Sequence, residues 1–99
     1  MPTFVLMTRL DLEQHEASAR RAAGKRWLKK VQTACPEVHW VAHYALLGPY
    51  DFMDIYNAPD VETAHRVSLI SRAGGARSAE SWEALPYEDY LKALEDVLG

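Results

Sequence analysis

The sequence predicts an α+β domain with two helices on one face of a four-stranded antiparallel sheet, followed by a third helix. Strand-like runs alternate with helical patterns along the chain, and a Gly-Pro pair joins the two central strands. Such a short connection requires these strands to be antiparallel. Because 99 residues with 48% hydrophobic content suffice for one core, we expect a single domain over residues 1–99.

The chain opens with a strand pattern and continues into a helix. Residues 3–10, "TFVLMTRL", are β-branched and apolar with a period of two. Strong helix formers dominate residues 12–34, and Cys35-Pro36 ends this helix because the residue before proline disfavours helical backbone. We expect Cys35 to pack at the helix end. One helical stripe should be buried: Ala23, Trp27, Val31 and Ala34.

A hairpin follows. Residues 38–47, "VHWVAHYALL", and residues 50–58, "YDFMDIYNA", are rich in aromatic and aliphatic side chains and flank Gly48-Pro49. Pro49 suits the second position of a four-residue turn over residues 48–51. Asp51 should close this turn by accepting backbone hydrogen bonds rather than by exchanging protons with a substrate.

The second half of the chain predicts a helix, an edge strand and a final helix. Asp60 is a good N-cap, and Gly74-Gly75 would stop the helix that it opens. Residues 76–85, "ARSAESWEAL", form a weaker strand pattern that suits a sheet edge. Pro86 begins the final helix, residues 86–99. The resulting β-α-β-β-α-β order with a C-terminal helix is the ferredoxin-like arrangement.

The sheet face opposite the two helices, called the open face below, has no cover within one chain. Its expected side chains are too apolar to remain in water. We therefore predict that two copies stack these faces, forming a homodimer that is a dimeric α/β barrel.

Strand alternation assigns the candidate site to this open face. His43 and Asp54 should be neighbours across the hairpin, where the carboxylate would fix the imidazole tautomer for general acid or base catalysis. His39, Tyr50, Phe52 and Tyr56 are the candidate ligand-binding residues on the same face. The set expected to face the helices is Val38, Trp40, Ala42, Tyr44, Leu46, Met53 and Ile55.

Charge and composition narrow the function classes. The net charge of −3 argues against a nucleic-acid partner, and no stretch approaches the ~20 apolar residues of a membrane helix. We expect a cytoplasmic protein. Six basic residues lie within residues 20–30, either as a solvated helix face or as a docking patch for an anionic ligand or partner. His39 and His43 would be ~13 Å apart on a strand, so no metal site is expected. No Gly-rich phosphate loop is present, and no cofactor is expected.

The segment "LLGPYDFMDIYNAPD", residues 46–60, resembles the segment that names the GYD-domain family. Gly48, Tyr50 and Asp51 match the signature, and the opening "MPTFVLMTRL" is also similar to that family. The resemblance implies the fold of the dimeric α/β-barrel superfamily, which includes effector-binding modules, small monooxygenases and isomerase-like enzymes. It assigns no catalytic role to any residue.

Three functional hypotheses follow for a stand-alone domain of this kind. The first is a homodimer that binds a small aromatic or carboxylated molecule between its stacked sheets. The second is a cofactor-independent enzyme, a monooxygenase or an isomerase-like proton-transfer enzyme, that uses His43 and Asp54. The third is a structural assembly protein whose open face is only a dimer interface.

Overall fold

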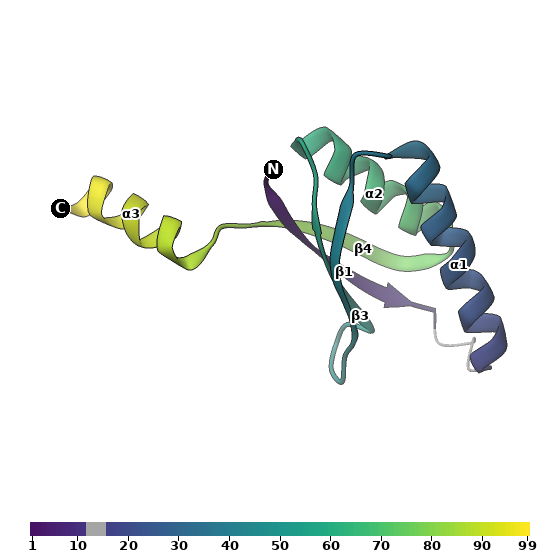
Figure 1. The fold of residues 1–99 in the computed structure, drawn as a ribbon. Coiled ribbons are helices and arrows are strands. Elements are labelled where there is room, and N and C mark those ends of the chain that lie inside the picture. The colour runs from purple at the N-terminus through teal and green to yellow at the C-terminus, as the bar shows by residue number, and fades with distance from the viewer. Residues whose placement is uncertain (12–15) are drawn as a thin grey trace.

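The structure, a computed structural model, describes residues 1–11 and 16–99 and has the predicted α+β architecture (Figure 1). The start of the first helix expected over residues 12–34, residues 12–15, lies outside the described residues. The elements follow the predicted order: β1 (Thr3–Leu10), α1 (Ala17–Ala34), β2 (His39–Ala45), β3 (Phe52–Asn57), α2 (Val61–Ala73), β4 (Ala76–Ala84) and α3 (Tyr87–Leu98).

The four strands form one antiparallel sheet in the order β2-β3-β1-β4. This order, with β1 and β3 in the centre, is the ferredoxin-like arrangement predicted from the sequence. The fourth strand, β4, lies at an edge, as its weaker strand pattern predicted. Both α1 and α2 lie on the same side of the sheet (Figure 1), so the opposite face is open.

The core lies between the sheet and these two helices. Val31 of α1 and Val67 of α2 are fully buried against Phe4 and Leu6 of β1. Cys35 is buried at the end of α1, as expected for a small packing residue. Ala34 is exposed, so the predicted buried stripe of α1 ends one turn earlier, at Val31.

The second helix begins and ends as its sequence predicts. The carboxylate of Asp60 accepts hydrogen bonds from the Thr63 amide at 2.8 Å and from the Thr63 hydroxyl at 2.7 Å. At the other end, the amide of Gly74 donates to the carbonyl of Ile70, and Gly75 has a φ of +104° that favours glycine.

The connection between β2 and β3 is longer than the predicted four-residue turn. It spans residues 46–51 and is closed by a hydrogen bond of 2.9 Å from the Leu46 amide to the Asp51 carbonyl. Gly48 within it has a φ of +152°. The Asp51 carboxylate accepts a backbone hydrogen bond, as expected, but the donor is the Leu10 amide of β1, at 2.7 Å, and not an amide of the turn.

The last helix, α3, stands clear of the domain (Figure 1). Within the described chain, it packs against no other helix or strand. None of the described helices is long and apolar enough to cross a membrane.

Candidate functional site

His43 and Asp54 face each other across the β2-β3 hairpin. They are directly opposite in the strand register, and Nδ1 of His43 lies 2.5 Å from Oδ1 of Asp54. The Asp54 side chain is buried, while 60% of the His43 side chain is exposed. Burial raises the pKa of Asp54, and the adjacent His43 partly offsets this rise. The structure thus brings together the two candidate catalytic residues.

The pair does not lie on the open face, so that prediction is wrong. On β3, the side chains of Phe52, Asp54 and Tyr56 all point to the helix side of the sheet. The Tyr56 ring is fully buried and lies 5.1 Å from the Trp40 ring, and its hydroxyl is 2.8 Å from Oγ of Ser81. Four predicted site residues therefore face the helices: His43, Phe52, Asp54 and Tyr56.

A β-bulge in β2 explains part of this error. Trp40 pairs with Tyr56 but Ala42 pairs with Ile55, so Val41 is one extra residue in β2. The bulge places Trp40 and His43 on the same side, although strict alternation separates them. Four residues that we expected to face the helices lie on the open face instead: Ala42, Tyr44, Met53 and Ile55. The pairing of β3 with β1 is regular, so the bulge in β2 does not account for the two residues of β3.

Polar side chains that face the helices explain the rest of the error in assigning residues to the two faces. We assigned the more uniformly apolar set to the core, yet β3 buries a tyrosine and an aspartate there. Each has a partner: the Tyr56 hydroxyl contacts Ser81 and the carbonyl of Ala64, and Asp54 contacts His43. A buried polar group that keeps its hydrogen bonds costs little.

A groove of about 1170 Å³ lies beside the pair, between α1 and the β2-β3 end of the sheet. The pair, Trp40 and Phe52 line its sheet side, and Arg20, Gly24 and Trp27 line its α1 side. Ser71 at the end of α2 also lines it and accepts a hydrogen bond of 2.7 Å from the Trp27 indole.

Tyr50 and His39 remain on the open-face side, as predicted, and lie apart from this groove. The Tyr50 hydroxyl donates to the Glu80 carboxylate at 3.0 Å, and this bond raises the pKa of Tyr50. The Tyr50 ring also contacts Trp82 and the Arg9 guanidinium, with centroid distances of 5.9 and 5.0 Å. These contacts give the signature tyrosine a structural role at the loop.

The open face itself is largely apolar. Trp82 of β4 and Tyr44 of β2 are exposed large side chains at its two edges. Between them lie partly buried residues of the central strands: Val5, Met53 and Ile55. This is the surface on which the dimer prediction depends.

The sequence-based site missed the groove residues on α1. Arg20 was assigned to the basic cluster, as a solvated helix face or a docking patch for an anionic ligand or partner, and Trp27 was assigned to a buried stripe. A glycine inside a helix is unfavourable and often has a packing or functional reason, so Gly24 was a signal for this place. Among the described residues, no group of three or more His, Cys, Asp or Glu side chains could hold a metal ion.

Chemically, the His43-Asp54 pair is an oriented imidazole beside an apolar and basic groove. An ionised Asp54 accepts a hydrogen bond from Nδ1–H of His43, which leaves Nε2 as the basic nitrogen. This arrangement suits hydrogen bonding to a ligand or proton transfer at Nε2.

Comparison with known proteins gives the family. The GYD domain model matches residues 4–94. A protein of Thermus thermophilus, named "Glutamine synthetase and cystathionine beta-lyase binding protein", is 30% identical over 95 residues, which cover 96% of this chain and 100% of that protein. No solved structure matches the chain significantly. With the signature residues Gly48, Tyr50 and Asp51 in place at the β2-β3 loop, the chain belongs to the GYD domain family.

Proposed function

We propose that this protein is a homodimeric binding module whose ligands are other proteins, specifically metabolic enzymes. The observation that carries the proposal is α3, an amphipathic helix that packs against no other element in the described part of the chain. Amphipathic helices of this kind bind apolar grooves of partner proteins through residues at helical spacing.

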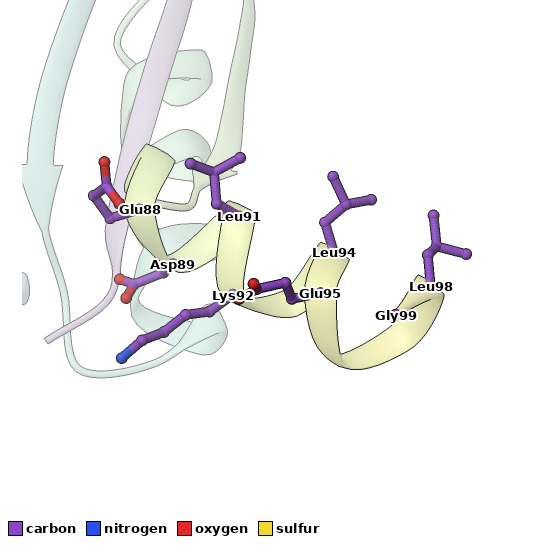
Figure 2. Close-up of a pocket in the computed structure, with 8 residues that line it drawn as sticks. All are labelled: Glu88, Asp89, Leu91, Lys92, Leu94, Glu95, Leu98 and Gly99. Atoms are coloured by element: carbon purple, nitrogen blue, oxygen red, sulfur yellow. The ribbon is translucent and has the colours of Figure 1, made fainter.

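The apolar stripe of α3 is continuous and exposed. Figure 2 shows Leu91, Leu94 and Leu98 pointing in the same direction, with Asp89 and Lys92 on another side of the helix. The hollow along these residues is lined by α3 alone, so it is an open helix face and not an enclosed cavity. The stripe comprises Tyr87, Tyr90, Leu91, Leu94, Val97 and Leu98.

The charge of α3 supports a specific partner over unspecific association. The rest of the helix consists of four acidic residues, one lysine and one alanine. An acidic border around an apolar stripe would select a partner groove with a basic rim and would repel a second acidic α3.

The Thermus thermophilus protein, which the match covers over its whole length, supports enzymes as the partners. Its name describes binding to glutamine synthetase and cystathionine β-lyase, and the match extends over nearly all of this chain. We extend that class of partner to this protein by similarity.

The open face supports the homodimer. Its apolar strip, from Tyr44 through Ile55 and Val5 to Trp82, lies on the opposite side of the sheet from α1 and α2. Stacking two such faces would bury these side chains and leave each α3 free. A dimer would present two α3 helices, which increases avidity for an oligomeric enzyme.

The experiment is an equilibrium titration of the intact protein against purified glutamine synthetase and purified cystathionine β-lyase of its own organism. An unrelated oligomeric enzyme of similar size and charge is the control. We expect saturable binding to at least one of the two enzymes and none to the control. Absence of binding to both enzymes at micromolar concentrations would refute the proposal.

A further inference from the structure

The groove beneath α1 is separate from both surfaces of the proposed function. It lies on the helix side of the sheet, whereas the proposed dimer interface is the open face. No residue of α3 lines it. An activity of this groove can therefore be present or absent independently of protein binding.

The groove is open because α1 is held away from the sheet. Among the described elements, α2 packs closely on β4 and β1, but α1 comes close only to α2. Trp27 bridges the gap at one end by contacting Trp40 at 5.1 Å between ring centroids. About one turn before Trp27, between it and Arg20, the facing residues of α1 are small, Ala23 and Gly24.

Gly24 keeps this space empty. A Cβ built at Gly24 would meet no atom within 4 Å, so the missing side chain is not required by packing. Glycine inside a helix costs about 1 kcal/mol relative to alanine. The helix thus bears an unfavourable residue at a position where a larger side chain would project into the groove.

Flat rings line the groove on two sides. Trp27 and Trp40 form one wall. Phe52 and His43 form another, with their rings stacked at 5.3 Å. Aromatic walls of this kind favour a flat apolar ligand, because rings stack face to face with an offset or edge to face.

Most of the charged side chains that line the groove within the described chain are basic, although the sequence is acidic overall. Arg20, Arg21, Lys25 and Arg26 line it, whereas its described acidic residues are Asp11 and Asp54, of which Asp54 is paired with His43. The Arg20 guanidinium lies 5.8 Å from the Phe52 ring centroid and forms no ion pair with a described carboxylate. A guanidinium stacked on a ring keeps its N–H edges free for a carboxylate.

We propose that this groove binds a small aromatic carboxylate, with the carboxylate on Arg20 and the ring between Trp27 and the Phe52-His43 stack. The surrounding basic residues raise the local concentration of anions. Nε2 of His43, on a side chain that is 60% exposed, supplies a further hydrogen-bonding position for a ring substituent.

Tryptophan fluorescence tests the proposal directly. Trp27 and Trp40 line the groove, whereas the third tryptophan, Trp82, lies on the open face. In a Trp82→Phe variant, the remaining tryptophan fluorescence therefore comes from residues that line the groove. The probes are benzoate and indole-3-acetate, with benzamide and indole-3-acetamide as uncharged controls of the same shape. We expect saturable changes for at least one acid and binding at least about tenfold weaker for its amide, because a charge-assisted hydrogen bond is lost.

Three variants place the binding in the groove. Arg20→Gln should weaken acid binding at least about tenfold. Lys30→Gln, which removes a charge from the same helix outside the groove, should leave it unchanged. Gly24→Phe should abolish binding by filling the space, and its melting temperature should not fall, because a more favourable helix residue replaces glycine.

Several outcomes would overturn the inference. They are the absence of saturation by either acid at millimolar concentrations, equal binding of acid and amide, or an equal effect of Arg20→Gln and Lys30→Gln. Because Arg20→Gln leaves the packing of the helix intact, a folding failure of Gly24→Phe alone does not remove the test. Loss of enzyme binding without loss of these effects would refute only the proposed function.

Discussion

The carboxylate of Asp51 accepts a hydrogen bond of 2.7 Å from the backbone amide of Leu10. The Asp51 amide in turn donates to the carbonyl of Thr8 at 2.8 Å. The signature aspartate therefore fastens the β2-β3 loop to the end of the central strand β1. In this family member, the signature holds the hairpin in register beside the groove.

Replacing Asp51 should destabilise the domain. Asp51→Ala leaves the Leu10 amide without this acceptor, and a hydrogen bond to a charged group contributes about 1.5–3 kcal/mol. Asp51→Asn keeps an acceptor oxygen and should recover part of the loss. Urea unfolding measures both, with Asp96→Ala on the exposed face of α3 as the control. An unfolding free energy equal to that of the wild type in Asp51→Ala would contradict the structural role.

The buried hydroxyl of Tyr56 should also contribute to stability. Tyr56→Phe removes the bond to Ser81, although Ser81 keeps its contact with Ser68 at 2.7 Å. We expect a loss of about 1 kcal/mol, compared with about 2–5 kcal/mol for Leu6→Ala in the same core. Tyr44→Phe on the exposed edge is the control and should be neutral. A neutral Tyr56→Phe would show that the hydroxyl adds nothing to folding.

The N-cap of α2 should make stability depend on pH in the acid range. Hydrogen bonds from Thr63 lower the pKa of Asp60 below its ordinary value of 3.8. A carboxyl whose pKa is lower in the folded state stabilises the fold while ionised. The wild type should therefore exceed Asp60→Ala in stability above pH 3.8, and the difference should shrink as the pH falls through the lowered pKa. A difference that stays constant under acid unfolding would disprove the charged cap.

Much of the fold could be predicted from the sequence because its signals are local. The Asp60 cap, the Gly74-Gly75 stop and the period of two in residues 3–10 depend only on neighbours along the chain. The short β2-β3 connection then allowed only an antiparallel pair.

The candidate site could be predicted only in part. The proximity of His43 and Asp54 could be predicted from the hairpin, because the short connection determines which residues of the two strands lie near each other. The side of the sheet did not follow, because the bulge at Val41 and the partners of Tyr56 depend on tertiary contacts. The groove could not be predicted either, because it depends on where α1 lies relative to the sheet, and no local sequence pattern determines that position.

A charge on the open face should separate the proposed dimer. Ile55→Lys places an ammonium group in the middle of the apolar strip, where stacking would bury it without a partner. Light scattering should give twice the chain mass of 11.2 kDa for the wild type and the single chain mass for the variant. Ala22→Lys on the exposed side of α1 adds the same charge and should stay dimeric. A monomeric wild type would contradict the pairing.

The affinity of α3 variants for purified glutamine synthetase and purified cystathionine β-lyase tests the central claim most directly. Leu94→Glu and Lys92→Gln each lower the net charge by one, but only Leu94 lies in the apolar stripe (Figure 2). For whichever enzyme the wild type binds, we predict that Leu94→Glu weakens binding at least about tenfold, as for a central interface residue, and that Lys92→Gln binds like the wild type. Equal affinity of both variants for that enzyme would contradict a binding role for α3.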